Sequence, residues 1–164
     1  TDWVLFSEGV VASSGATPVG GRLFTADLAA VLKTTTAAAE RIKREVGASP
    51  DREGLEHSAV EAPTLGGEGN QVHSAVFAAE ILHERARDLF IRIHRVLVSQ
   101  GLDRLPRAGM VLTGGGAALD GLEEIAEHLT DERAVACTGD RLGLARCLVV
   151  VAHCLLEVIR IYSA

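Results

Sequence analysis

The spacing of apolar side chains changes several times along the chain, and each change predicts a new element. Residues 3–6 and 10–18 are short apolar stretches on either side of a Ser-Glu-Gly sequence, which predicts two strands joined by a tight turn. Gly20 and Gly21 then interrupt the pattern. Over residues 22–33 the apolar positions recur every three or four residues, and this period predicts a helix.

A second helix and a less regular segment follow. The threonines at 34–36 supply capping hydroxyls for a helix over residues 37–47, and Gly47 is the expected C-terminal stop. Residues 48–73 are expected to be irregular, apart from a short strand at 59–65, because glycine and polar residues dominate there.

The second half of the chain alternates between helix and strand patterns. Helices are expected over 75–99, 119–129 and 140–162, and strands over 108–115 and 133–137. Charged residues interrupt the apolar run of the closing helix, so this run predicts a buried helix rather than a membrane span. Short loops between these elements favour an α/β layer with some parallel strand pairing.

Composition narrows the range of functions. The chain has 164 residues, 48% hydrophobic and 23% charged, which is typical of a globular protein with one domain or two small subdomains. Its net charge of -6 and its 4% aromatic content argue against nucleic-acid binding, which uses basic surfaces and stacking aromatics. The three cysteines form no disulfide framework, the six histidines form no metal-binding motif, and no signal peptide is recognised.

Three consecutive glycines, Gly114, Gly115 and Gly116, stand between a predicted strand and a predicted helix. Glycines cost backbone entropy on folding, so such a run needs a reason. Backbone amides and a helix N-terminus favour anions, and this arrangement therefore suits a phosphate or a nucleotide. The spacing matches neither the dinucleotide-binding nor the P-loop motif, so ligand contact and a structural turn are both open interpretations.

Two other segments carry candidate chemistry. Glu40 and Lys43 lie one turn apart on the predicted second helix, where they either hold a sugar or a base by hydrogen bonds or form a solvated face. Glu40 can also pair with Arg44 at a spacing of four residues. Gly20 and Gly21 either turn the chain or let a phosphate approach the backbone.

In this order, the segments resemble the second half of the FtsA family, the actin-like bacterial cell-division proteins. The resemblance is carried by TDWVLFSEGVV, PVGGRLFTADLAAVLKTTTAAAERIKREVG, VEAPTLGG, ILHERARDLF and GMVLTGGGAALDGLEEIAEHL. It implies an α/β fold, namely an actin-like (ribonuclease H-like) ATPase lobe with an inserted smaller α/β subdomain. Residues 1–33 and 73–164 would form the base subdomain of the second lobe, and residues 34–72 an inserted nucleotide- and partner-binding subdomain.

The resemblance also implies a ligand, ATP with Mg²⁺, bound in the full-length protein. The second lobe of an actin-like ATPase supplies the adenosine side of the cleft, and no catalytic residue or protein metal ligand is implied for it. The implied contact residues are Gly20, Gly21, Glu40, Lys43, Gly114, Gly115 and Gly116. Because the first lobe is absent from this sequence, we expect the chain alone to bind ATP weakly or not at all and not to hydrolyse it.

The same resemblance implies a role in linking FtsZ to the membrane during cell division, in the cytoplasm at the inner face of the membrane. The FtsZ C-terminal tail would dock on residues 34–72, where the loop GGEGNQVHS departs from the family's more basic loop. Membrane contact would be indirect, through a C-terminal helix that this sequence lacks, and an exposed lobe interface favours self-association. The alternatives are an MreB-like or pilus-assembly scaffold and a chaperone-type ATPase lobe.

Overall fold

The computed structural model forms two sheets and four α-helices in the part of the chain that it describes. The described residues are 1–7, 9–49, 51, 53–67, 69–101, 109–130, 134–137 and 157–163. The larger sheet has the strand order β2-β1-β7-β5-β6. Its strands are β1 (Asp2–Ser7), β2 (Val10–Ala16), β5 (Met110–Gly114), β6 (Ala134–Cys137) and β7 (Glu157–Ser163).

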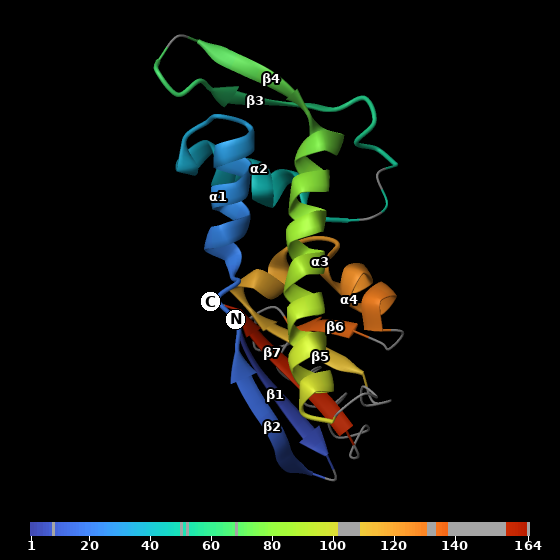
Figure 1. Ribbon diagram of the computed structural model, residues 1–164. Helices are drawn as coiled ribbons and strands as arrows, with labels where there is room; N and C mark the ends of the chain where they lie inside the picture. The colour runs from blue at the N-terminus through green and yellow to red at the C-terminus, as the bar shows by residue number, and fades with distance from the viewer. Residues whose placement is uncertain are drawn as a thin grey trace.

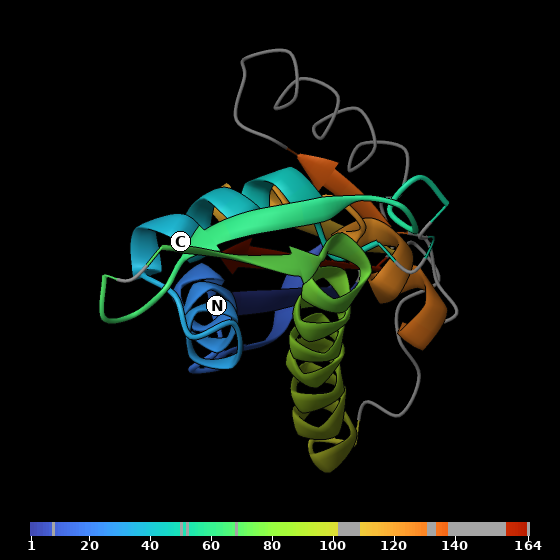
Figure 2. The same ribbon diagram turned by 90° about the horizontal axis from the view of Figure 1, so that it is seen from above.

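The smaller sheet pairs β3 (Ala59–Pro63) with β4 (Asn70–Ser74) in antiparallel fashion. The helices are α1 (Gly21–Val31), α2 (Thr36–Val46), α3 (Ala75–Ser99) and α4 (Leu122–Thr130), with a 3-10 turn, η1, at Gly115–Ala118. Figure 1 shows the large sheet at one end of the molecule, α1, α2 and the β3–β4 pair at the other, and α3 running along both. The β3–β4 pair lies across α1 and α2 when seen from above (Figure 2).

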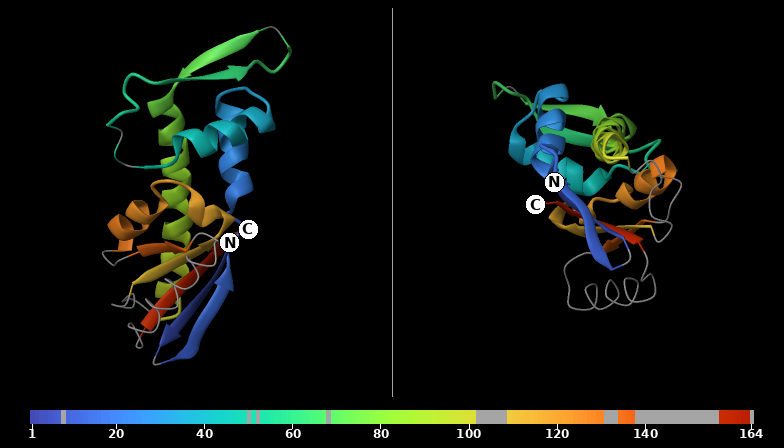
Figure 3. Two further views of the ribbon diagram at one scale, coloured as in Figure 1. Left: turned by 180° about the vertical axis from the view of Figure 1, so that it is seen from behind. Right: turned by 60° about the horizontal axis from the view of Figure 1, so that its bottom comes forward.

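The large sheet combines both kinds of pairing. β1 is antiparallel to β2 and β7, whereas β5 is parallel to both β6 and β7. In β1 the alternate residues Trp3 and Leu5 are buried, while β5 buries Met110, Val111 and Leu112 in a row. An uninterrupted apolar run is typical of a strand covered on both faces, as parallel strands usually are. Figure 3 shows α4 beside β6 at one edge of this sheet and the β1–β2 pair at the opposite edge.

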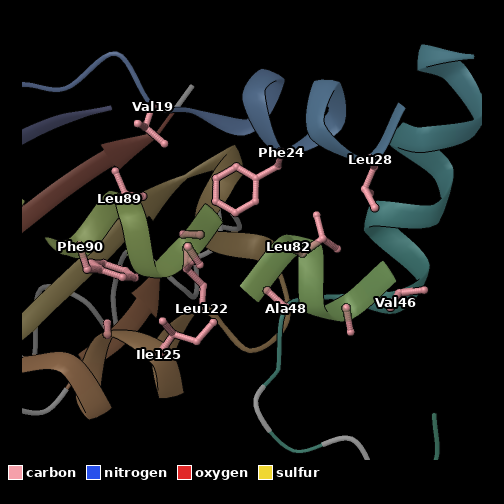
Figure 4. Packing of buried hydrophobic residues seen from close by; sticks show 14 of the residues in the cluster. Val19, Phe24, Leu28, Val46, Ala48, Leu82, Leu89, Phe90, Leu122 and Ile125 are labelled. Atoms are coloured by element: carbon pink, nitrogen blue, oxygen red, sulfur yellow. The ribbon is translucent and has the colours of Figure 1, made fainter. Parts of the chain in front are cut away.

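The hydrophobic core surrounds α3, which contacts each of the three other helices. Leu82, Leu89, Phe90 and Ile93 recur at helical spacing on its buried face. Phe24 of α1 points toward this face beside Leu89 (Figure 4). Burial of each such side chain contributes about 1.5–3 kcal/mol, so the helical period that predicted α3 also accounts for its place in the core.

The ends of α2 agree with the sequence prediction. Thr35 is the N-cap, and its side chain accepts a hydrogen bond from the Ala38 amide at 3.3 Å. Gly47 ends the helix with a φ of 71°, a left-handed conformation that favours glycine. Thr34 is buried and its hydroxyl donates to the Pro63 carbonyl at 2.7 Å, which ties the start of α2 to β3.

Two sequence predictions differ from the structure. Residues 70–74 form strand β4, although the segment was expected to be irregular. The strand was not predicted because Val72 is its one apolar residue, so the sequence shows no clear alternation of apolar and polar positions. The closing helix predicted over 140–162 is wrong at its end, where β7 is a strand between β1 and β5. An apolar run without clear periodicity suits a central strand as well as a buried helix, and the β-branched residues of β7 favour the strand. Residues 140–156 of that prediction lie outside the described residues.

The remaining predicted helices, at 22–33, 37–47, 75–99 and 119–129, are confirmed within a few residues as α1, α2, α3 and α4. Among the described residues, no helix has the combination of length and apolar composition that crossing a bilayer requires. The subdomain boundaries near residues 34 and 72 stay a prediction.

Candidate functional site: a cavity between α2 and the glycine-rich loop

A cavity of about 690 Å³ opens between the start of α1, the middle of α2 and the loop that follows β5. Its apolar wall includes Phe24 of α1, Leu89 and Phe90 of α3, and Leu122 of α4; Figure 4 shows these four side chains among the packed helices. Its polar wall comes from α2 and the glycine-rich loop. The volume lies within the usual range for small-molecule sites, which are mostly apolar with a few placed polar groups.

The three glycines of the glycine-rich loop differ in position: one makes a turn and two line the cavity. Gly114 has a φ of 90°, a left-handed conformation needed for the turn from β5 into η1, and it does not line the cavity. Gly115 and Gly116 do line it. A Cβ atom placed on Gly115 would meet no other atom within 4 Å, so this stretch of backbone faces open space that a ligand can enter.

The polar wall on α2 is built around the Lys43 ammonium group, whose side chain is 14% exposed. Lys43 Nζ donates to Glu40 Oε2 at 2.6 Å, to Thr25 Oγ1 at 2.9 Å and to the Gly21 carbonyl at 3.2 Å. The Thr25 hydroxyl in turn lies 2.5 Å from Glu40 Oε2. An ammonium has three donors, and here all three have acceptors within the chain.

This cluster keeps Glu40 ionised. The hydrogen bond from Lys43, followed by that from Thr25, lowers the pKa of Glu40 from 4.5 to about 2, and partial burial opposes the shift. Arg44 Nε contacts the other carboxylate oxygen of Glu40 at 3.1 Å, which confirms the pair predicted from the spacing of four residues. Because the Arg44 side chain is 77% exposed, this contact is weak.

The remaining sequence candidates lie at the start of α1. Gly21 lines the cavity, and its carbonyl accepts from Lys43 and lies 3.1 Å from the Thr25 hydroxyl, whose one proton goes to Glu40. Gly20 is the N-cap of α1 with an extended φ of -158°, and it does not line the cavity. The structure therefore brings five of the seven candidates to one cavity and leaves Gly20 and Gly114 in supporting positions beside it.

Sequence reasoning missed Thr25 and the apolar wall. Thr25 is 4% exposed, and it lies four residues after Gly21, on the same face of α1. A buried threonine on an otherwise apolar helix face is a signal that was available in the sequence, because a buried hydroxyl needs a partner. Its partners Glu40 and Lys43 are distant in the sequence, and no local pattern identifies them.

A second, shallower hollow lies between α1 and α3. Arg85 joins the two helices: its Nε and Nη2 atoms lie 2.5 and 2.9 Å from the two carboxylate oxygens of Asp27, and Nη1 lies 3.1 Å from Asp88. The Asp27 carboxylate raises the pKa of Arg85 above its usual value. Val31 and Ile81 form the apolar part of this hollow. No group of three or more His, Cys, Asp or Glu side chains in the described part of the chain is placed to hold a metal ion.

Comparisons with known proteins agree on one family. A family model described as "Cell division protein FtsA" matches residues 1–152. The cell division protein FtsA of Neisseria meningitidis is 37% identical over 134 residues, which cover 80% of this chain and 32% of that protein. The FtsA of Bacillus subtilis is 29% identical over 144 residues, covering 88% of this chain and 32% of that protein. The chain thus spans about a third of the length of these relatives.

The fold is also similar to that of a solved structure. The crystal structure of MreB5 of Spiroplasma citri bound to ADP superposes with a TM-score of 0.67 at 16% sequence identity, over 93% of this chain and 51% of that one. The likeness confirms the actin-like α/β fold expected from the sequence.

Proposed function

Because the chain belongs to the FtsA family of cell-division proteins, we propose that its large cavity is the adenosine side of an ATP site in the complete protein. The observation that carries the proposal is the meeting of Gly21, Glu40, Lys43, Gly115 and Gly116 at one cavity. These residues come from three separate segments of the chain. The fold that the chain shares with ADP-bound MreB5 supports the same conclusion.

The cavity suits a nucleoside in volume and in chemistry. Its apolar wall of Phe24, Leu89 and Phe90 accepts a flat, weakly polar group such as a base. Glu40 and Lys43 neutralise one another, so together they favour neutral hydroxyl groups, such as those of a sugar, over phosphates. The backbone of Gly115 and Gly116 lines the cavity and can approach a ligand closely, because glycine carries no side chain.

A substitution on α2 tests the assignment. Lys43→Ala in the complete protein removes three hydrogen bonds from the polar wall, and we expect the Kd for ATP with Mg²⁺ to rise about tenfold or more in titration calorimetry. Arg41→Ala is the matched control, since Arg41 lies on the same helix but contacts Glu45 and the Glu61 carbonyl, away from the cavity. Equal ATP affinity in the two variants would refute the proposed role of Lys43.

The site is one half of a cleft. We infer that Mg²⁺ and the chemistry of hydrolysis depend on residues of the other lobe of the complete protein, so the 164-residue chain alone binds ATP weakly or not at all and has no ATPase activity. A phosphate-release assay comparing this chain with the complete protein measures the difference. Steady ATP hydrolysis by the chain alone would refute the proposal that hydrolysis depends on the other lobe.

For the cellular role, we propose that the protein links FtsZ to the inner face of the membrane, and that residues 34–72 receive the FtsZ C-terminal tail. Leu65, next to β3, and Val72 in β4 are 61% and 66% exposed, and such apolar side chains suit a peptide partner. Calorimetry with a synthetic FtsZ tail peptide tests the proposal, with Leu65→Ser and Val72→Ser expected to weaken binding. Absence of binding to the folded wild-type protein would refute it.

A further inference from the structure

Three elements meet at the edge of the cavity, and two of them touch through their backbones. The chain leaves α2 as Gly47, Ala48 and Ser49 and crosses the turn at Asp120 and Gly121 that precedes α4. The Ala48 amide donates to the Asp120 carbonyl at 2.7 Å, and Gly47, Ala48 and Gly121 are buried. We call this contact the backbone junction.

Glycine is required on both sides of the backbone junction. Gly121 has a φ of 82°, and a Cβ atom there would lie 2.1 Å from both Cα and N of Ser49. Gly47 has a φ of 71°, and a Cβ atom there would lie 2.7 Å from Cβ of Asp120. Side chains rarely adopt this backbone conformation, and at Gly121 the obstacle is main chain, which cannot rotate away. The two backbone segments are therefore in direct contact, with no room for a side chain between them.

A third element, α3, holds the backbone junction from one side. The His83 ring nitrogen Nδ1 lies 3.3 Å from the Ala48 carbonyl. A carbonyl only accepts hydrogen bonds, so Nδ1 carries the proton and donates it to this contact. Figure 4 shows Ala48 next to the turn of α3 that bears Leu82, the neighbour of His83.

The backbone junction connects the two polar walls of the cavity. One wall, α2 with Glu40 and Lys43, ends one residue before Gly47; the other wall, the loop with Gly115 and Gly116, ends at Asp120. We propose that Gly121, together with His83, is a positioning site that sets the separation of these walls and thereby the affinity for the nucleotide, without touching it. The proposal rests on the function proposed above for the cavity.

The size of the effect follows from the contact distance. A Cβ atom at position 121 must move from 2.1 Å to at least 3 Å from the Ser49 backbone, so the walls separate by about 1 Å. A misplacement of about 1 Å is enough to reduce binding and catalysis many-fold where several groups must contact one ligand together. A purely structural role predicts something different, namely a lower unfolding temperature with an unchanged Kd in the folded protein.

The test compares two glycine substitutions that share backbone strain but differ in contact. Gly121→Ala introduces the clash, whereas Gly101→Ala is the matched control, since Gly101 has a φ of 79° and nothing within 4 Å of its Cβ position. Both are made in the complete protein, and the Kd for ATP with Mg²⁺ is measured by calorimetry where circular dichroism shows each variant folded. We expect Kd to rise at least about tenfold for Gly121→Ala and to stay within about twofold for Gly101→Ala.

A second pair of variants decides the question if Gly121→Ala does not fold. His83→Leu removes the donor to Ala48 and is expected to weaken ATP binding, whereas His83→Asn keeps a donor near the Nδ1 position and is expected to restore it. Wild-type affinity in His83→Leu, or in a folded Gly121→Ala, would overturn the positioning role and leave the nucleotide site intact. A wild-type protein that binds no ATP would instead overturn the proposed function, and the positioning role with it.

Discussion

The ion pair between Glu40 and Lys43 makes a quantitative prediction about stability and pH. Replacing Glu40 with glutamine keeps the size of the side chain and an acceptor for Thr25, but it removes the negative charge beside the Lys43 ammonium. The folded-state pKa of Glu40, about 2, lies below the ordinary value of 4.5, so the ionised carboxylate stabilises the folded state. This contribution is fully present above about pH 4.5 and is lost as the pH falls through about 2.

The magnitude follows from the size of that pKa shift. A drop from 4.5 to about 2 corresponds to about 3 kcal/mol of unfolding free energy. The Glu40 side chain is 34% exposed, and solvent screening reduces the contribution to about 1–2 kcal/mol. Glu40→Gln should therefore lower the unfolding free energy at pH 7 by about 1–2 kcal/mol.

The assay is urea unfolding of the wild-type chain and Glu40→Gln at a series of pH values from 7 to about 2.5, followed by circular dichroism. The difference between the two unfolding free energies isolates Glu40, because all other carboxylates titrate in both proteins. We expect this difference to be largest above about pH 4.5 and to shrink steadily toward pH 2. A difference that is the same at pH 7 and pH 2.5 would show that the ionised pair does not stabilise the fold.

Three further predictions concern packing and assembly. Thr25→Val leaves a site of the same shape without its hydroxyl, so it should lower the unfolding free energy by about 1–2 kcal/mol in urea unfolding, and Thr25→Ser should recover most of it. Gly15→Ala places a Cβ 2.5 Å from the Trp3 ring, which should cost about 1–3 kcal/mol and change the tryptophan fluorescence of the folded chain; unchanged emission and stability would contradict the packing described. We also predict that the 164-residue chain self-associates in solution, and a single monomer mass at all concentrations in sedimentation equilibrium would contradict this.

Local spacing was sufficient to predict the pair of Glu40 with Arg44, four residues apart on α2. The ion pair between Glu40 and Lys43, three residues apart on the same helix, was not predicted. Helix periodicity likewise predicted α1, α2, α3 and α4. Contacts between distant segments carry no such signal. Thr25 reaches Glu40 and Lys43 only because α1 packs against α2, and β7 is a strand because two other strands flank it.

The glycines between residues 114 and 121 illustrate why contacts within one segment can be predicted from the sequence and contacts between distant segments cannot. In the sequence, the choice between a turn and ligand contact applied to Gly114, Gly115 and Gly116, and Gly121 carried no prediction. The structure separates them by what surrounds each: Gly114 needs its positive φ, Gly115 faces the cavity, and Gly121 admits the backbone of Ser49. The third reason involves a partner more than seventy residues away in the chain, so only the fold reveals it. Gly121 does not line the cavity. A substitution at Gly121 would therefore alter the geometry of the cavity without removing a direct ligand contact, and so it distinguishes a positioning role from a binding role.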